Sequence, residues 1–452
     1  MKISENKEFI AYLEDGVGQR EAAIALQALD EPASISVRLN PYKLADSAVF
    51  SLKTASPVLW NRHGLFLNER PVFTLDPVFH SGGYYVQDSS AMFVGHVFRK
   101  ALGRFCNLDR PIRVLDLCAA PGGKTTDISA SLRETYGNSY MLVANEVMRQ
   151  RVNVLSENVA LWGDANVAVT CSDPKAFASL NGFFDIIVAD VPCSGEGMFR
   201  KDEEAVNYWS VANVELCRAR QRRIIADVWP ALAEGGVLIY STCTFNKYEN
   251  DDNVSWISEE LGADIIRIPT EFDGLVATKS GISLVPGLVR GEGQYCAALV
   301  KTAGTPTFRF GKRVFQACRT DFDWLFKVGM RFKEKGGTVI AVPEDVVREV
   351  SALETLHPIM EGVAIGVVKG KDFVPDADLA LSLDLDEGAF PRIEVSRDKA
   401  LAFLHKDAIA FPEAEKGIIL LTYSGLPMGF VKNIGNRCNN LLPQSRKIRM
   451  NI

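Results

Sequence analysis

The chain has 452 residues, which exceeds the size of a single hydrophobic core and predicts about two to four domains. A hydrophobic content of 47% and a charged content of 23% fit an ordinary soluble globular protein. The formal net charge of −6 counts mildly against a nucleic-acid partner, although local basic patches matter more than the sum.

The cysteine and histidine content indicates whether disulfides or a metal site are expected. The nine cysteines are scattered without a CxxC pair, which predicts reduced thiols in a cytoplasmic protein. The five histidines form no cluster, so we expect no catalytic metal. The N-terminus has no apolar signal core, and no run approaches the roughly 18 apolar residues of a spanning helix, so we expect no membrane association.

The N-terminal region, residues 1–85, differs in pattern from the rest of the chain. It begins with a helical pattern, continues with a strand at residues 34–40 and then has a strand-like stretch to residue 79. We expect it to form a region of its own.

Residues 112–240 alternate between strands and helices. Short apolar runs predict strands at 112–117, 141–144, 167–169, 186–189 and 237–240. One helical stripe consists of Met148, Val152, Leu155, Val159 and Trp162. A second consists of Ile224, Ile225, Val228, Trp229 and Leu232, with Gly235-Gly236 as its C-cap. This alternation predicts a doubly wound α/β domain.

The alternation stops after about residue 303. Residues 302–307 have the composition of a linker, and the acidic segment 376–388 is loop-like and marks a second boundary. The last segment is predicted to be a small β-rich module, with its clearest strand at 417–423. We therefore expect domains at 1–85, 86–303, 308–388 and 389–452.

Two basic clusters could contact a polyanion or could be merely solvated faces. One lies in the helix that contains Arg218, Arg220, Arg222 and Arg223; the other lies in the tail and contains Lys432, Arg437, Arg446, Lys447 and Arg449.

A turn of small residues follows the first predicted strand, where α/β proteins bind nucleotide-like ligands. Its residues are Cys118, Ala119, Ala120, Pro121, Gly122, Gly123 and Lys124. A phosphate-binding P-loop needs glycine at position 118, and a dinucleotide site needs GxGxxG; neither is present. A nucleoside ligand without pyrophosphate remains, such as S-adenosyl-L-methionine. The alternative is a tight turn without a ligand.

Two acids follow the next two strands. Glu146 lies where, in such α/β folds, an acid accepts hydrogen bonds from both ribose hydroxyls of a bound nucleoside. The alternative is an acid that the helix dipole favours at the N-terminus of the next helix. Asp173 lies where an adenine amino group could be bound, although Asp-Pro is also a common turn.

The fourth strand ends in Asp190 and continues through Pro192 to Cys193, and Cys243 follows the fifth strand. A thiolate that adds to carbon 6 of a pyrimidine makes carbon 5 nucleophilic towards a methyl sulfonium. Asp190 could stabilise that adduct through the cytosine ring or its amine. Low thiol pKa values would help, and we expect them. The alternative for each cysteine is a small core residue, as we expect for Cys118, Cys171 and Cys217.

These stretches resemble the Nop/Sun (NSUN) family of RNA 5-methylcytosine methyltransferases. The resemblance covers roughly residues 35–303 and rests on VRLNPYK, YYVQDSSAM, CAAPGGKT, the Glu146 position, DVPCSGEG, RQRRI, STCTFNKYEN and RGEGQYCAALVK. The tail GLPMGFVKNIGNRCNNLLP resembles the PUA-like RNA-binding module of the RsmF-type branch, which acts on 16S ribosomal RNA.

The resemblance implies a Rossmann-like class I methyltransferase domain, an N-terminal α+β RNA-binding region, an intermediate α+β domain and a C-terminal PUA-like module. It implies that the 118–124 loop, Glu146, Asp173 and Asp190 hold S-adenosyl-L-methionine or lie beside it. It assigns Cys243 as the nucleophile and Cys193 to release of the product, whereas chemistry alone favours Cys193 as nucleophile. Lys124 needs a partner at its helix N-terminus, either a substrate phosphate or Asp190.

One departure concerns the segment before RGEG, which is 286–289 here and lacks the histidine that relatives often carry. The sequence therefore predicts a monomeric, cytoplasmic enzyme that makes 5-methylcytosine in RNA, with small-subunit ribosomal RNA as substrate. Transfer RNA is the alternative substrate. A non-catalytic RNA-binding or ribosome-assembly factor is the rival from another class, and a nucleotide hydrolase is a third.

Overall fold

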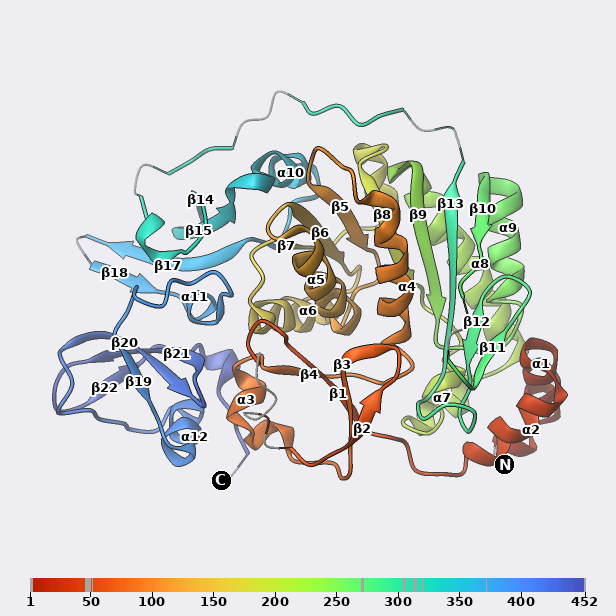
Figure 1. The fold of residues 1–452 in the computed structure, drawn as a ribbon, viewed down its shortest axis with the longest axis horizontal. Helices are drawn as coiled ribbons and strands as arrows, with labels where there is room; N and C mark the ends of the chain where they lie inside the picture. The colour runs from red at the N-terminus through yellow and green to blue at the C-terminus, as the bar shows by residue number, and fades with distance from the viewer. Residues whose placement is uncertain are drawn as a thin grey trace.

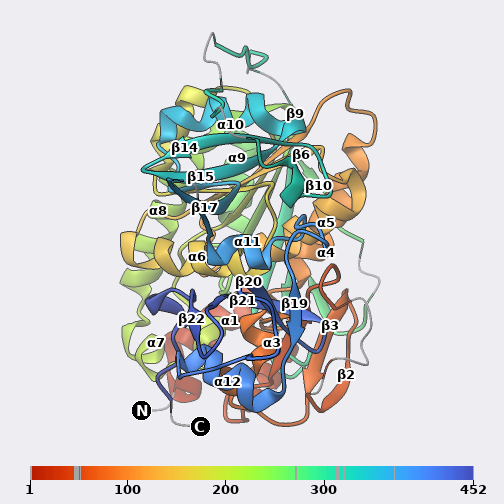
Figure 2. The same ribbon diagram turned by 90° about the vertical axis from the view of Figure 1, so that its left-hand side faces the viewer.

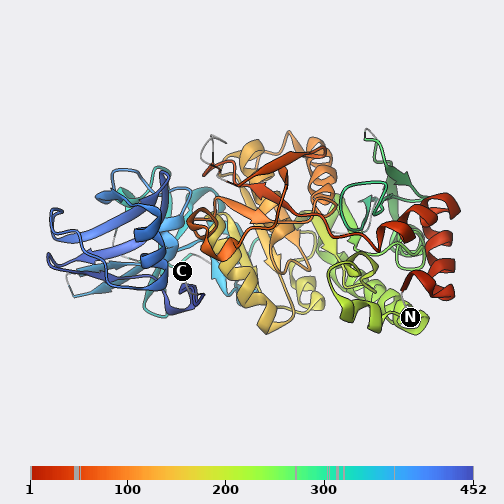
Figure 3. The ribbon, with the colours of Figure 1, turned by 90° about the horizontal axis from the view of Figure 1, so that it is seen from below.

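The computed structural model describes residues 3–44, 50, 52–269, 272–302, 304, 306–311, 315–318, 321–370 and 372–450. The molecule is elongated: helices α1 (Lys7–Val17) and α2 (Gln19–Ala28) lie at one end and the C-terminal sheet lies at the other (Figure 3). A large sheet occupies the middle (Figure 1).

The strand order of the central sheet is β11-β12-β13-β9-β8-β5-β6-β7-β16, with β10 also paired to β13. The parallel strands are β5 (Ile112–Asp116), β6 (Tyr140–Asn145), β7 (Val167–Thr170), β8 (Phe184–Asp190) and β9 (Leu232–Thr242). The antiparallel strands are β10 (Ala263–Ile266), β11 (Leu275–Ala277), β12 (Ile282–Leu284) and β13 (Gln294–Lys301). The parallel strands confirm those predicted from the sequence.

Helices cover both faces of this sheet, as the sequence predicted. One core contains residues of α4 (Phe93–Leu102), α5 (Gly123–Tyr136) and α6 (Arg149–Trp162). The opposite core contains residues of α8 (Val211–Val228), α9 (Asp251–Leu261) and α10 (Val347–Leu353). Neighbouring strand residues such as Val114 and Leu115 point into different cores, because side chains alternate along a strand.

The predicted end of the second helical stripe is wrong. Helix α8 ends at Val228, a short 3-10 turn follows, and Leu232 already begins β9. Gly235 and Gly236 therefore lie inside β9 and form no helix cap. The register between β8 and β9 shifts near Phe184, and this bulge accommodates the extra residues of β9.

The N-terminal sheet has the order β2-β3-β1-β4. Its strands are β1 (Ser36–Leu39), β2 (Thr54–Val58), β3 (Asn61–Leu67) and β4 (Tyr84–Val86). The predicted strand-like stretch to residue 79 is wrong beyond β3: a 3-10 turn and the short helix α3 (Pro77–His80) follow instead. Asp76 begins α3 because its carboxylate accepts the Val78 N–H at 3.0 Å.

An intermediate sheet and a C-terminal sheet complete the fold. The intermediate strands are β14 (Met330–Lys335), β15 (Thr338–Pro343), β17 (Val363–Lys369) and β18 (Asp372–Pro375). The C-terminal strands are β19 (Arg392–Glu394), β20 (Gly417–Tyr423), β21 (Leu426–Asn433) and β22 (Cys438–Asn440), with helix α12 (Arg397–His405) beside them. Strand β20 coincides with the predicted strand 417–423.

The intermediate region is joined to the central sheet. Strand β16 (Met360–Glu361) pairs antiparallel with β7 and extends the central sheet at that edge. Helix α11 (Ala377–Leu381) contacts both β17 and β21 and lies between the intermediate and C-terminal sheets (Figure 2). Among the described residues, no helix combines the length and the apolar character that crossing a membrane requires.

The acidic segment 376–388 is not wholly loop-like as predicted, because it contains helix α11. Asp376 caps α11, Asp378 pairs with Arg446 at 2.6 Å, and the buried Asp384 pairs with Arg133 of α5. The acids of this segment therefore connect domains. Arg446, which the sequence placed in a basic tail, is largely buried by this pairing.

Arg38 fastens the N-terminal sheet to the central domain. Its fully buried guanidinium donates to the Gly123 carbonyl at 3.1 Å, to Thr126 Oγ1 at 2.5 Å and to Gln87 Oε1 at 2.9 Å. It also lies over the Trp162 ring, 4.7 Å from the centroid. Burial lowers the pKa of Arg38, and the Asp127 carboxylate opposes this effect.

Arg38→Met should lower the free energy of unfolding by about 3 kcal/mol, because buried acceptors lose their donor. Urea denaturation followed by tryptophan fluorescence measures this. The matched control is Arg62→Met on β3, whose arginine is 64% exposed and paired with Glu134. We expect the control to cost less than about 1 kcal/mol. Equal costs would contradict the assigned role of Arg38.

Candidate active site

The predicted site residues lie where parallel strands end. The 118–124 loop follows β5, Glu146 follows β6, Asp190 ends β8 and Cys243 follows β9. The carboxyl ends of parallel strands share one edge of a sheet. In Figure 1 this edge faces the N-terminal strands, which agrees with the contact between Arg38 and Gly123.

The loop after β5 is a tight turn that leads directly into α5. The Ala119 N–H donates to the Asn145 carbonyl at 2.8 Å, which ties the loop to the end of β6. Gly122 has φ +111°, a left-handed conformation that favours glycine. Helix α5 begins at Gly123, so its first N–H groups point into the site.

Asp116, the last residue of β5, is a buried carboxyl group that the sequence analysis did not single out. One oxygen accepts a hydrogen bond from Thr125 Oγ1 at 2.6 Å, and the other has no hydrogen-bond partner among the described residues. Burial raises the pKa of Asp116 to about 7, although the Thr125 hydrogen bond and the Lys124 charge oppose this. An acid at the end of a predicted strand was the available signal.

Glu146 is 4% exposed and is held in place by two contacts. Its carboxylate accepts the Met148 N–H at 3.0 Å and pairs with Arg151 at 3.0 Å. Arg151 also donates to the Ala120 carbonyl at 2.8 Å and so connects Glu146 with the loop. The carboxylate keeps acceptor capacity for further donors.

Asp173 lies in an Asp-Pro turn, which was the alternative to its predicted role in adenine binding. It is exposed, and its carboxylate accepts the Lys175 N–H at 3.0 Å at the start of a 3-10 helix, Pro174–Leu180. A role in adenine binding stays a prediction.

Lys124 and Asp190 form an ion pair at the centre of the site. Lys124 Nζ lies 2.7 Å from one Asp190 oxygen. The other oxygen accepts hydrogen bonds from Ser241 Oγ at 2.7 Å and Gln294 Nε2 at 3.1 Å. Burial disfavours the ammonium group, but the Asp190 carboxylate outweighs it and raises the pKa of Lys124. Of the two predicted partners for Lys124, the structure shows Asp190.

The two cysteines lie side by side, with 3.2 Å between their sulfur atoms. The hydrogen bond with Cys243, burial, and the charges of Glu249 and Asp190 raise the pKa of Cys193 well above its ordinary value. The expected low pKa is therefore wrong for Cys193. A charge interaction with Cys243 contributes to raising the pKa of Lys124.

A buried polar network holds the two cysteine turns together, and the sequence analysis missed it. Glu196 accepts the Phe245 N–H at 2.6 Å and the Asn246 N–H at 3.1 Å. The Gly197 N–H donates to the Cys243 carbonyl at 2.7 Å, and a Cβ at position 197 would lie 3.0 Å from that oxygen. The SGEG and STCTFN turns therefore interlock, and glycine permits the close approach.

The remaining cysteines differ in their burial. Cys217 is buried in α8, as expected of a core residue, and Cys171 is partly buried. Burial raises the pKa of Cys118, the first residue of the loop. Within the described ranges, no group of three or more His, Cys, Asp and Glu residues could hold a metal ion.

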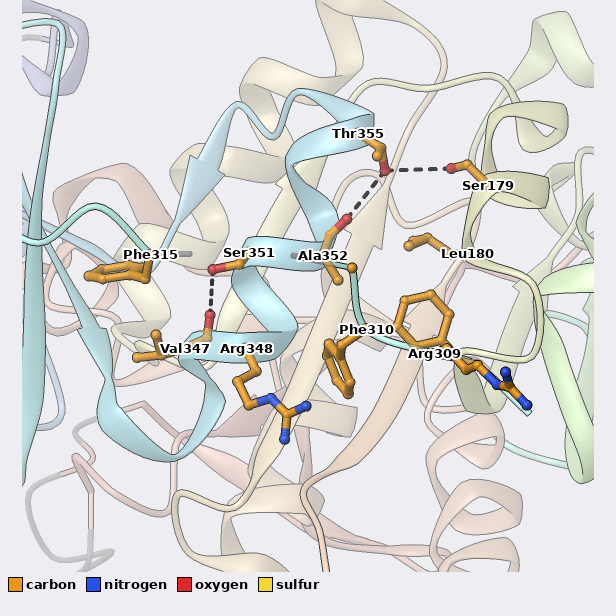
Figure 4. A pocket seen from close by; sticks show the side chains of 12 residues that line it. Ser179, Leu180, Arg309, Phe310, Phe315, Val347, Arg348, Ser351, Ala352 and Thr355 are labelled. Carbon is orange, nitrogen blue, oxygen red and sulfur yellow. Dashed lines mark hydrogen bonds between the residues drawn. The ribbon is translucent and has the colours of Figure 1, made fainter. Parts of the chain in front are cut away.

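A cavity of about 590 Å³ lies away from this site (Figure 4). It is lined by Leu180, Phe310, Val347, Arg348 and neighbouring residues from three segments of the chain. None of its lining residues belongs to the predicted site. The active-site candidate is therefore the strand edge that carries the cysteines.

Comparisons with known proteins cover most of the chain. The model for the 16S rRNA methyltransferase RsmB/F family matches residues 107–300. The N-terminal domain of 16S rRNA methyltransferase RsmF matches residues 6–89, and the RsmF PUA domain matches residues 390–448. The chain is 30% identical to the ribosomal RNA small subunit methyltransferase F of Pectobacterium atrosepticum, over 93% of this chain and 90% of that protein.

The chain belongs to the RsmB/F methyltransferase family. The protein of the same name from Escherichia coli O157:H7 is 28% identical over 93% of this chain and 91% of its own length. These matches confirm the resemblance inferred from the sequence, including its RsmF-type tail.

Solved structures confirm the fold. NSun6 from Pyrococcus horikoshii aligns with a TM-score of 0.53 at 19% identity, covering 66% of this chain and 99% of that one. A methyltransferase homologue from the same organism aligns with a TM-score of 0.55 at 22% identity, covering 66% and 96%. The central domain is therefore a Rossmann-like methyltransferase domain, as predicted.

The pKa of Asp116 predicts a pH dependence of stability. In the folded protein the Asp116 carboxyl group keeps its proton up to about pH 7, whereas in the unfolded chain it loses the proton near pH 4. Because the folded state binds the extra proton, the free energy of unfolding falls as pH rises between these values. Asp116→Asn removes the effect, so between pH 4.5 and 7 it should lose less stability than the wild type, by on the order of 3 kcal/mol. Urea titrations at four pH values measure this, and parallel curves would contradict it.

Proposed function

We propose that this protein uses S-adenosyl-L-methionine to methylate carbon 5 of a cytosine in small-subunit ribosomal RNA, through a covalent adduct between Cys243 and carbon 6. The observation that carries the proposal is the pair of cysteine sulfurs 3.2 Å apart, beside the Lys124–Asp190 ion pair at the carboxyl edge of the sheet. Membership of the RsmB/F family supports RNA methylation, and the names of the relatives support the small-subunit substrate.

The residues at the strand ends fit S-adenosyl-L-methionine. Glu146 is buried and fixed, with free acceptor capacity for ribose hydroxyls. The unpartnered oxygen of Asp116 and the first N–H groups of α5 offer polar contacts beside it. Asp173 would contact the adenine, and the 118–124 loop and Asp190 would lie beside the reactive end. When bound, this cofactor supplies an electrophilic methyl group.

The electrostatic difference between the two cysteines favours Cys243 as the nucleophile. Lys124 is paired with Asp190, and a charge interaction with Cys243 contributes to raising the pKa of Lys124. Glu249 and Asp190 raise the pKa of Cys193, so Cys193 keeps its proton and can donate an S–H hydrogen bond to Cys243. If Cys193 were the nucleophile, as chemistry alone favoured, the thiol that must ionise would be the one whose pKa Glu249 and Asp190 raise.

The proposed reaction needs the Cys243 thiolate, a methyl donor and a base that takes the carbon 5 proton. The Cys243 thiolate bonds to carbon 6, and the carbon 5–carbon 6 double bond opens to an enamine that Asp190 can stabilise. Carbon 5 then takes the methyl group as the methyl–sulfur bond breaks, and the sulfonium would leave as a neutral thioether. Removal of the carbon 5 proton by a base restores the double bond and breaks the bond between carbon 6 and Cys243. Cys193 lies close enough to donate to the departing sulfur.

The RNA must present an unstacked cytosine, because base pairing hides carbon 6 from a thiolate. We assign phosphate and shape contacts to the N-terminal region and the PUA-like module. In the basic tail, Arg437 and Arg449 are exposed and can serve this role, whereas Arg446 is engaged with Glu157 and Asp378. We propose that the enzyme works as a monomer in the cytoplasm.

The central test uses Cys193→Ala and Cys243→Ala, each mixed with unmodified small-subunit RNA or subunits and S-adenosyl-L-methionine. Cys193→Ala should accumulate a protein–RNA adduct that survives denaturing gels, because product release fails. Cys243→Ala should form none. Mapping the RNA in the adduct identifies the cytosine that is bound to the protein. The matched control is Cys296→Ala, a buried cysteine of β13, which should turn over without accumulating adduct.

The opposite pattern would assign the nucleophile to Cys193. If the wild type methylates the RNA while neither variant forms an adduct, the two-cysteine mechanism fails. If the wild type methylates transfer RNA and not ribosomal RNA, only the proposed substrate fails. Tight cofactor binding without turnover on any RNA would favour the non-catalytic RNA-binding factor.

Glu146→Gln should weaken S-adenosyl-L-methionine binding by about tenfold or more, because an amide replaces one acceptor of the ribose hydroxyls. Isothermal titration calorimetry on the free protein measures this. Glu134→Gln, a partly exposed carboxylate on α5, is the control and should bind as the wild type does. An unchanged affinity for Glu146→Gln would remove Glu146 from the cofactor site.

A further inference from the structure

Cys193 is held by hydrogen bonds to the residues on either side of it. The Ser194 N–H donates to Glu249 Oε2 at 3.1 Å. On the other side, Gln221 Nε2 donates to the Pro192 carbonyl at 3.0 Å. The same Gln221 nitrogen donates to Glu249 Oε2 at 2.7 Å, so the two supports act as one unit. Glu249 and Gln221 are both fully buried.

Glu249 also reaches the turn that carries Cys243. Its second oxygen accepts from Asn246 Nδ2 at 2.9 Å, and its own N–H donates to Asn246 Oδ1 at 2.9 Å. The Asn246 amide also donates to Thr244 Oγ1 at 3.0 Å, the residue after Cys243. One carboxylate therefore contacts both cysteine turns.

The charge of Glu249 is not neutralised by its hydrogen-bond partners. Among the described residues these are the Ser194 N–H and the amides of Gln221 and Asn246, all uncharged. The charge of Glu196, which is also buried, acts on Glu249 and raises its pKa. The contact with Cys243 and the charges of Glu249 and Asp190 thus raise the pKa of Cys193, and Lys124 is paired with Asp190 at 2.7 Å.

We propose that Glu249 is a positioning residue that fixes the Cys193 turn against Cys243 and places a negative charge on the Cys193 side of the pair. This deepens the proposed function, on which its catalytic meaning rests, because it gives the two cysteines different roles. Glu249 contacts neither sulfur through a hydrogen bond recorded in the structure and acts through Ser194, Gln221 and the electric field.

The titration of Glu249 gives the proposal a pH signature. Burial and the neighbouring Glu196 raise the pKa of Glu249 to about 7. Below this pH the carboxyl group is neutral and its effect on Cys193 is lost. Above it the negative charge disfavours the Cys193 thiolate. A residue with only a structural role would not change the reactivity of Cys193 in this window.

The test is the alkylation rate of each cysteine by iodoacetamide in the free full-length protein, followed by peptide mass spectrometry between pH 6 and 9. In Glu249→Gln, Cys193 should react about three- to tenfold faster than in the wild type at pH 8, because the thiolate fraction changes about tenfold per pKa unit. The difference should vanish near pH 6. Glu249→Asp keeps the charge but shortens the side chain, so the alkylation rate of Cys193 should lie closer to that of the wild type than in Glu249→Gln.

The same spectra contain the controls. The exposed Cys106 reports reagent activity, and the buried Cys296 reports unfolding. Glu361→Gln removes a buried carboxylate of β16 that pairs with Lys333 and Lys335, and it should leave Cys193 unchanged. Equal Cys193 rates in Glu249→Gln and wild type, with Cys296 protected, would overturn the proposal.

If Glu249→Gln exposes Cys296, Gln221→Met takes its place. That variant keeps a similar volume and removes the donor to Pro192 and Glu249, so Cys193 alone should become more reactive. An unchanged Cys193 there would also overturn the proposal. The measurement uses neither RNA nor cofactor, so its result is independent of whether the proposed methylation is correct.

Discussion

The register between the parallel strands β8 and β9 is the constraint on which the site depends. Asp190 lies opposite Ser241 in this register, and Ser241 donates a hydrogen bond to the Asp190 carboxylate. Cys193 follows the end of β8 by three residues, and Cys243 directly follows the end of β9. A shift of one residue would direct the side chains of a strand to the other face and separate the sulfurs. The bulge near Phe184 restores the register before the site is reached.

A second constraint is the cost of burying charge. Asp116, Glu146, Glu196 and Glu249 are all buried around one strand edge, where each must be hydrogen-bonded or protonated. Backbone N–H groups stabilise the buried Glu196 carboxylate, and the Met148 N–H group together with Arg151 stabilises that of Glu146. Asp116 and Glu249 are only partly compensated, and their pKa values rise to about 7. Perturbed groups of this kind concentrate at functional sites.

The flanking domains are fixed to the catalytic domain by buried contacts. Arg38 joins the N-terminal sheet to the start of α5, and β16 extends the central sheet. Asp384 pairs with Arg133 of α5, and Arg446 pairs with both Glu157 and Asp378. These contacts fix the N-terminal and C-terminal regions relative to the sheet edge that carries the cysteines.

The sequence by itself determined the parallel strands, the loop after β5, the two cysteines and the family, because apolar periodicity and motif spacing are local properties. It misjudged the end of α8, the stretch after β3 and the acidic segment before residue 388, since composition does not reveal which partners bury a residue. It could not assign different environments to Cys193 and Cys243. The environment of Cys193 comes from Cys243, Glu249 and Asp190, which only the tertiary structure brings together, because electrostatic effects depend on distance in space and on burial.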